Sequence, residues 1–233
     1  MNMRSSPHEL VGIGLYSVGD VARLLKTPAR TIRRWMGGYD YVHEGERREV
    51  PPLWQPDIGQ IDDQLELSFR DLIELRFVRA FVGMGMDLRA VRNCMELARE
   101  CVQSDRPFSS GRFRTDGKTI FLESLDRLDE SALIDLRKKQ YVFKTVVEQT
   151  FRDLDVDQDI VRRWRPYRGK DSIVVDPERS FGQPVATRFG VPSVVLAQAV
   201  EAEGSVARVA ALYEVASSVV KDAVRFHEEL AAA

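Results

Sequence analysis

Three arginines in one short stretch of the sequence have the spacing of a surface that binds nucleic acid. Arg30, Arg33 and Arg34 are three and four positions apart, so on a helix they project from neighbouring positions of one face. An arginine guanidinium can donate two hydrogen bonds to a guanine base, or it can hold a phosphate. Arg23 and Lys26 precede them, and no acidic residue lies between the first and the last of these five. We therefore expect this stretch to contact duplex DNA; the alternative is an ordinary solvated helix face.

Two short helices and a hairpin are expected to position these side chains. Ser17 can cap a first helix, and Thr27, which is followed by proline, can cap a second helix that ends at Gly37. A helix-turn-helix spanning about Ser17 to Trp35 would lay its second helix in the major groove. The sequence of residues 41–50 predicts a small β-hairpin. It directly follows the second helix, as the wing does in a winged helix-turn-helix. The residues expected to contact DNA are Ser17, Arg23, Lys26, Thr27, Arg30, Thr31, Arg33, Arg34, Arg47 and Arg48.

The composition fits a folded, water-soluble protein. The chain has 233 residues, 44% of them hydrophobic and 30% charged, with a formal net charge of −2. That length allows one large domain or two to three small ones. No apolar run approaches the roughly 20 residues that span a bilayer, and residues 1–14 lack the apolar segment of a signal peptide. We therefore expect no membrane association and a cytoplasmic location.

The residues that could form a metal or catalytic site are few. Cys94 and Cys101 are seven positions apart on an expected helix, which favours core packing over a role as thiol sensors or metal ligands. The alternating aspartates of residues 153–159 lack the glycine and the closing glutamate of a calcium loop. No nucleophile–base pair or phosphate-binding glycine loop is present in the sequence. We expect no metal, no cofactor and no enzymatic activity.

The order of the expected elements predicts a mainly α fold in four parts. A flexible lead (1–14) precedes a winged helix-turn-helix domain with two further helices (15–103). A linker region (104–171) contains a β-hairpin through Thr115–Lys118, indicated by an Asp-Gly pair, and a long helix over about 130–154. The C-terminal part (172–233) is a trihelical module of helix-turn-helix shape with glycine and serine at its joins.

The N-terminal part resembles a known family of regulators. The stretches that carry the resemblance are Leu15–Leu25, Thr27–Trp35, Leu67–Leu75 and Gly85–Arg92. They are similar to the winged-helix start and the next two helices of mercury-resistance-regulator (MerR) type proteins. The resemblance implies a dimer on a pseudo-palindromic operator. The resemblance ends near residue 103. After this point that family has a long coiled-coil helix, which this chain lacks. The resemblance therefore does not extend to the family's activation of transcription by DNA untwisting.

The C-terminal part resembles a small domain-of-unknown-function family whose members are described as VapB-like antitoxins. The residues that match its pattern are Gly182, Pro184, Val185, Arg188 and Val191, followed by three helices up to about Leu230. The departure is Phe189-Gly190, where that family has a Thr-Arg-Ile-like run. The resemblance implies an antitoxin of a type II toxin–antitoxin pair, which represses its operon and neutralises a toxin, commonly a PIN-domain ribonuclease.

Such a toxin binds its metal ion through a cluster of carboxylates. An arginine inserted into this cluster would neutralise the carboxylates. The candidate toxin-binding residues are Arg112, Arg114, Arg162, Arg163, Trp164 and Arg165. The alternative is that these arginines are surface charge or additional phosphate contacts. We expect a homodimer bound to duplex operator DNA and to a cognate toxin. The rival hypotheses are a MerR-like, effector-responsive transcriptional regulator without a toxin, and an adaptor with no DNA role.

Overall fold

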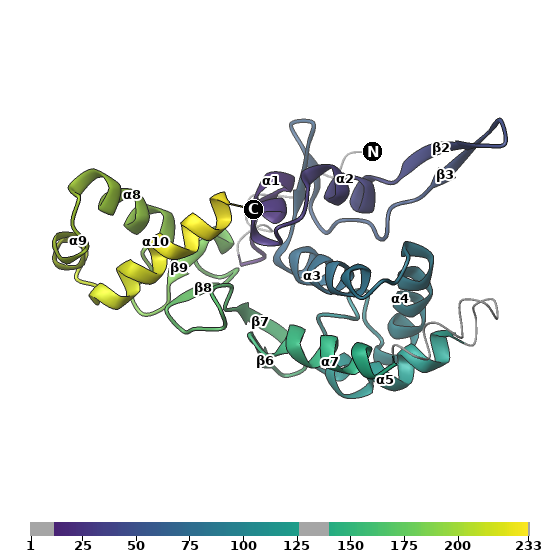
Figure 1. Cartoon of the computed structure of the whole chain (residues 1–233). Helices are drawn as coiled ribbons and strands as arrows, with labels where there is room; N and C mark the ends of the chain where they lie inside the picture. The colour runs from purple at the N-terminus through teal and green to yellow at the C-terminus, as the bar shows by residue number, and fades with distance from the viewer. Residues whose placement is uncertain (1–11, 126–139, 233) are drawn as a thin grey trace. The chain divides into compact units, whose positions relative to one another are not determined.

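The structure is a computed structural model that describes residues 12–125 and 140–232. The chain divides into two compact units, each assembled from segments that are distant in sequence. Unit 1 contains the described residues up to Ala29, Ile58–Phe69 and the residues from Arg162 onward; unit 2 contains Arg30–Asp57 and Arg70–Val161. Figure 1 labels most of the helices and strands of both units.

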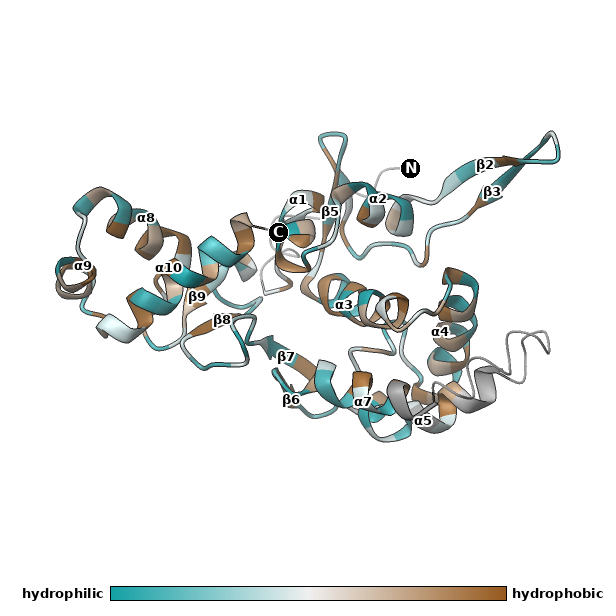
Figure 2. Ribbon diagram, in the orientation of Figure 1, coloured by the Kyte–Doolittle hydropathy of each residue, from teal (hydrophilic) through white to brown (hydrophobic). Residues whose placement is uncertain are grey.

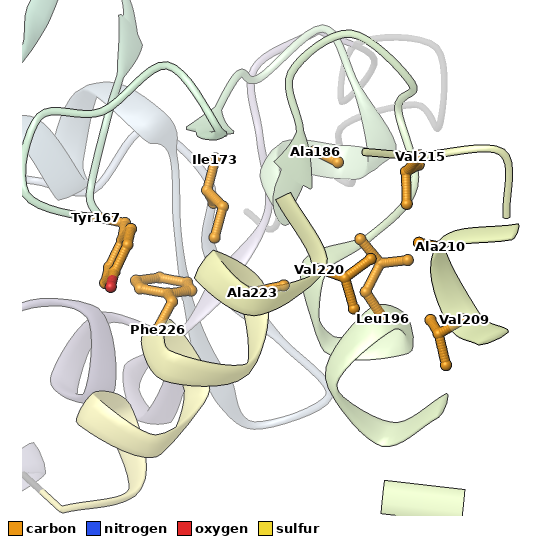
Figure 3. Close-up of a cluster of buried hydrophobic side chains, with 10 residues drawn as sticks. All are labelled: Tyr167, Ile173, Ala186, Leu196, Val209, Ala210, Val215, Val220, Ala223 and Phe226. Carbon is orange, nitrogen blue, oxygen red and sulfur yellow. The ribbon is translucent and has the colours of Figure 1, made fainter. Parts of the chain in front are cut away.

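Three helices at the end of unit 1 enclose an apolar core. They are α8 (Ser193–Glu203), α9 (Val206–Leu212) and α10 (Ser217–Ala231). Gly204 ends α8 in the left-handed conformation, at φ 65°, and Ser205 then caps α9 by accepting the backbone N–H of Arg208. Figure 3 shows Leu196, Val220 and other buried side chains of these helices in one cluster. These bounds confirm the three helices predicted for the C-terminal part.

Two sets of strands complete unit 1, together with α1 (Val18–Leu24). A three-stranded antiparallel sheet has the order β1 (Tyr16–Ser17), β5 (Gln64–Leu67), β4 (Gly59–Ile61). The second set consists of β8 (Ile173–Val175) and β9 (Pro184–Ala186), which pair with each other and belong to the largest sheet of the structure. The short 3-10 turn η2 (Ser180–Gly182) lies between them in the chain. The Tyr16 hydroxyl donates to the carbonyl oxygen of Gly182 at 2.8 Å. Gly182 has φ 84°, and a Cβ there would lie 2.2 Å from the Tyr16 hydroxyl oxygen, so only glycine fits.

Unit 2 has a helical body with a core rich in phenylalanine. Its elements are most of α2 (Ala29–Gly37) and of α3 (Phe69–Gly83), together with β2 (Tyr39–His43), β3 (Glu46–Val50), α4 (Leu88–Val102), α5 (Gly111–Leu125) and α7 (Gln140–Phe151). The Phe77 and Phe113 rings meet edge to face at 6.1 Å, and the Phe121 and Phe143 rings stack at 3.9 Å. Hydrophilic residues predominate along β2 and β3, which are almost entirely exposed (Figure 2).

The prediction of a mainly α fold is wrong. Helix accounts for 51% and strand for 18% of the structure, and the strands form three antiparallel sheets. The largest sheet has the order β6 (Leu154–Asp157), β7 (Ile160–Trp164), β8, β9, and β7 contains the boundary between the units. Residues 153–159, which contain the alternating aspartates, therefore lie mostly in strand β6. Its alternating aspartates are compatible with a strand because alternate side chains of a strand face solvent.

The prediction of a hairpin through Thr115–Lys118 is also wrong, because these residues lie inside helix α5. Phe113, Ile120 and Phe121 are spaced by seven and eight positions and are at most 2% exposed. Their burial on one face stabilises a helix and outweighs the turn preference of the Asp-Gly pair. The predicted long helix is described only from residue 140, where α7 begins; its earlier part lies outside the described residues.

The predicted hairpin near residue 45 is confirmed, and it is longer than expected, with Tyr39 pairing with Val50. Both helices predicted before it, α1 and α2, are present. The boundary between the units falls between Ala29 and Arg30, at the first turn of α2. The winged helix-turn-helix arrangement, and the domain limits proposed from the sequence, therefore stay predictions.

Candidate nucleic-acid interface

Helix α2 presents its arginines away from its buried side. The buried residues of this helix are Ile32, Trp35 and Met36. Arg30, Arg33 and Arg34 are exposed and Thr31 is half-buried. Within the described part of the chain, Arg30 and Arg33 form no ion pair. Both guanidinium groups are thus available to an anion without first giving up a carboxylate.

One side of the β2–β3 hairpin carries a row of aromatic side chains. Ring centroids are 6.3 Å apart between Tyr39 and Tyr41 and 6.5 Å apart between Tyr41 and His43. The guanidinium of Arg34 lies over the Tyr39 ring at 3.9 Å, which links α2 to the base of the hairpin. Arg48 is paired directly opposite Tyr41, so its side chain leaves the same side of the hairpin. We call Tyr39, Tyr41, His43 and Arg48 the aromatic face.

The other side of the hairpin is occupied by an internal ion pair. Arg47 donates from Nε to Asp40 at 3.1 Å, and this interaction raises the pKa of Arg47 above its ordinary value. Over residues 39–50 the hairpin has four carboxylates and two arginines, a net charge of −2 with histidine neutral. Of the two hairpin arginines predicted to contact DNA, Arg48 has no ion-pair partner among the described residues and Arg47 has one.

The predicted DNA contacts at the start of α1 are engaged within the helix. The Ser17 hydroxyl accepts the backbone N–H of Asp20 at 3.2 Å, while the Asp20 carboxylate accepts the backbone N–H of Ser17 at 3.1 Å. These two bonds form a capping box. Arg23 pairs with the same Asp20 at 2.5 Å. Ser17 therefore stabilises the helix end, and the charge of Arg23 is locally balanced.

Two more predicted contacts follow α1 in unit 1. Lys26 has a left-handed backbone, at φ 48°, and its ammonium lies 3.9 Å from Glu229 of α10. The Thr27 hydroxyl donates to the carbonyl oxygen of Leu25 at 3.0 Å. Both side chains lie in the turn after α1, and the Lys26 ion pair links this turn to α10. The structure brings them together with Arg23 in unit 1, whereas the α2 and hairpin arginines belong to unit 2.

The candidate toxin-binding residues also divide between the units. In unit 2, Arg112 lies 3.6 Å from Asp159, and Arg114 is exposed. In unit 1, Arg163 pairs with Asp176 at 2.8 Å and Arg165 with Asp171 at 3.2 Å, while Arg162 is exposed. The Trp164 side chain is 5% exposed and belongs to the core. On binding another carboxylate, Arg112, Arg163 and Arg165 would exchange the aspartate partners named above.

Residues that sequence reasoning missed include Tyr39 and the side chains that hold the base of the hairpin, Arg92 and Arg106. The alternation of Tyr39, Tyr41 and His43 is a local signal for an aromatic face and could have been used. Arg92 and Arg106 donate hydrogen bonds to backbone carbonyls about 40 and 50 positions earlier in the chain. No sequence pattern around either arginine indicates these distant partners.

Within the described residues, no helix is long and apolar enough to cross a membrane. In the same part of the chain, no group of three or more His, Cys, Asp or Glu side chains could hold a metal ion.

Comparison with solved structures places the fold. The chain is similar to the crystal structure of Rv2018 from Mycobacterium tuberculosis, with a TM-score of 0.71 and 22% sequence identity. The similarity covers 92% of this chain and 99% of that one, so the two proteins share a fold over almost their whole lengths.

Comparison of sequences adds one relative. The chain is 27% identical over 229 residues to a Mycobacterium tuberculosis protein named "Putative antitoxin VapB45", covering 91% of this chain and 93% of that protein. No protein-family model matches the chain.

Proposed function

We propose that this chain is the antitoxin of a type II toxin–antitoxin pair that binds operator DNA, represses its own operon and neutralises a partner toxin. The observation that carries the antitoxin role is the similarity to the protein named "Putative antitoxin VapB45", which extends over 91% of this chain. Similarity over that length includes both units, so it is not confined to one widely shared module. The proposed activity is binding without catalysis.

The proposed DNA-binding surface lies in unit 2, on α2 and the aromatic face. Arg30, Arg33 and Arg48 supply exposed guanidinium groups that no carboxylate of the described residues neutralises. Each guanidinium that reaches a phosphate releases a counterion, which gives affinity that falls as salt rises. The Arg34 guanidinium lies over the Tyr39 ring, which orients it for a contact with DNA. The other side of the hairpin has Asp40 and Glu49 against Arg47, a net charge of −1, which disfavours DNA on that side.

The partner in this proposal is a toxin protein, and the resemblance of residues 172–230 to VapB-like antitoxins points to a PIN-domain ribonuclease. An arginine inserted among the metal-binding carboxylates of such an enzyme would displace the ion. Arg112, Arg114, Arg162 and Arg163 are all exposed. Arg112, Arg163 and Arg165 would give up their aspartate partners on binding the toxin. We propose that the DNA-bound form is a homodimer, which matches a two-fold symmetric operator.

The test is coexpression of the tagged chain with the product of the neighbouring gene, followed by a pull-down and a gel shift on their shared upstream DNA. A stable protein complex that also shifts this DNA supports the proposal in full. A shift without a protein partner contradicts the antitoxin role and favours the effector-responsive regulator. A protein complex without any shift contradicts the operator-binding role.

A pair of variants tests the DNA surface itself. Arg33→Ala with Arg34→Ala should weaken binding to the upstream DNA and lower the slope of log affinity against log salt by about 2 if both groups contact phosphates. The matched control is Lys221→Ala with Arg225→Ala, which removes two exposed positive charges from α10. The protein complex should survive in both. Equal binding by the α2 variant and the wild type would mean that α2 does not contact the DNA.

A further inference from the structure

The segment that leaves the hairpin is fixed to unit 2 along its whole length. Residues 51–57, which we call the strap, follow β3 directly. Leu53 and Trp54 are each 5% exposed, in contrast to the exposed hairpin before them. The backbone N–H of Leu53 donates to the carbonyl oxygen of Trp35 at 2.8 Å. The strap is thereby joined to the end of α2, the helix that carries the candidate DNA contacts.

Arg92 of α4 holds the beginning of the strap. Its guanidinium donates to the carbonyl oxygen of Pro52 at 2.9 Å and to that of Pro51. Two N–H groups of one planar guanidinium can bind two successive carbonyls at once, which a lysine ammonium on a flexible stem does less well. The two prolines also limit the backbone freedom of the strap at this point. Arg92 thus attaches the returning leg of the hairpin to α4.

Arg106 holds the other end of the strap. It donates to the carbonyl oxygen of Gln55 at 2.7 Å, and it pairs with Asp57 at 2.6 Å and with buried Asp71 at 3.0 Å. Asp71 in turn accepts the indole N–H of Trp54 at 2.7 Å. Asp71 is 0% exposed, so its charge depends on these donors.

The base of the hairpin is closed at Gly38, between α2 and β2. Gly38 has φ 71°, and a Cβ at this position would lie 2.5 Å from the carbonyl oxygen of Val50, the last residue of β3. The close approach ties the outgoing leg of the hairpin to the returning leg. Because the returning leg continues into the strap, whatever orients the strap also orients α2 and the aromatic face.

We propose that Arg92 is a positioning residue for DNA binding: its guanidinium fixes the strap at Pro51 and Pro52, and so sets the direction in which α2 and the hairpin are offered to DNA. The inference rests on the proposed function, because it concerns the same DNA surface. Without Arg92, the hairpin and α2 sample more orientations in the free protein, and binding must restrict them. Arg106 keeps the far end of the strap in place, so the fold remains.

The test compares wild type with Arg92→Ala, Arg92→Lys and the control Arg79→Ala in binding to the DNA directly upstream of the gene, over a range of salt. Arg79 is an exposed residue of α3 that forms no ion pair within the described residues, so its removal changes net charge equally. Arg92→Ala should bind about tenfold more weakly, with an unchanged salt slope. Arg92→Lys should lie between Arg92→Ala and wild type, and Arg79→Ala should match wild type. Hydrogen exchange of the Leu53 amide should be faster in Arg92→Ala.

Two results would overturn the proposal. Arg92→Ala binding like wild type, with a faster Leu53 amide, would show that the strap is held by Arg92 but does not orient the DNA surface. A salt slope reduced by about 1 would show that Arg92 itself contacts a phosphate. A wild-type protein that fails to bind the upstream DNA would instead refute the proposed DNA function, and the exchange measurement would then still decide whether Arg92 holds the strap.

Discussion

Replacement of Glu74 by glutamine should change how the stability of the protein depends on pH. Glu74 lies on α3 and is 0% exposed. Its carboxyl oxygens accept the backbone N–H groups of Ser109 at 2.7 Å and Phe108 at 3.3 Å. Burial disfavours the charged form more than these bonds and the charge of Arg106 favour it, which raises the pKa of Glu74 from 4.5 to about 7.

The sign of the effect follows from the direction of this shift. Because the pKa of Glu74 is higher in the folded protein than in the unfolded chain, the folded state binds the proton more tightly. The stability that protonated Glu74 contributes is fully present below about pH 4.5 and is lost as the pH rises through about 7. At 1.36 kcal/mol per pKa unit, the loss amounts to about 3 kcal/mol.

Urea denaturation of the wild type and of Glu74→Gln at several pH values between about 5 and 8 measures this effect. Glutamine does not titrate, so the free energy of unfolding of the variant minus that of the wild type should increase by about 2.5 kcal/mol over this range, most of the full loss. Taking the difference removes the contribution of every other titrating group that both proteins share. A difference that stays constant with pH would refute the reasoning, because it would mean that Glu74 titrates alike in the folded and unfolded states.

Three further substitutions test the packing of the two units by thermal or urea unfolding. Gly182→Ala should cost about 2–4 kcal/mol, because φ is 84° and the new Cβ would overlap the Tyr16 hydroxyl; a cost near zero would mean that the chain shifts freely there. Ser205→Ala should cost about 1 kcal/mol by removing the cap of α9, and Ser205→Asp should retain most of the stability. Trp54→Phe should cost about 1.5–3 kcal/mol, since the buried Asp71 carboxylate loses its indole donor; Trp54→Phe with wild-type stability would show that this bond contributes nothing.

Helix ends and the first hairpin could be predicted because their signals act within a few residues. Ser17 caps α1 through Asp20, three positions later, and Gly204 with Ser205 separates α8 from α9. The apolar residues of α2 are spaced three to four positions apart, and this helical spacing likewise predicts its buried side and its exposed arginines. For the same reason, the basic surface of α2 was identifiable without a structure, although its partner was not.

The prediction failed where burial competes with a local preference. An Asp-Gly pair favours a turn, but Gly117 lies in α5, where a Cβ would meet the Phe113 ring at 3.3 Å. Which preference wins depends on what Phe113 and Phe121 pack against, and those partners come from α3 and α7. Strands β4 and β5 were missed because neither is apolar enough to stand out before it is paired.

Local chemistry along the chain was thus enough for the caps of α1 and α9, the first hairpin and the face on which α2 carries its arginines. The pairing of β1 with β5, the bond from Tyr16 to Gly182 across 166 residues, and the attachment of the strap by Arg92 and Arg106 follow only from the folded chain. The physical reason is that a cap or a periodic face depends on neighbours within about one helical turn. Long-range hydrogen bonds instead depend on which distant segments of the chain pack together and exclude water. The spacing of residues within one segment does not indicate which other segment it will pack against.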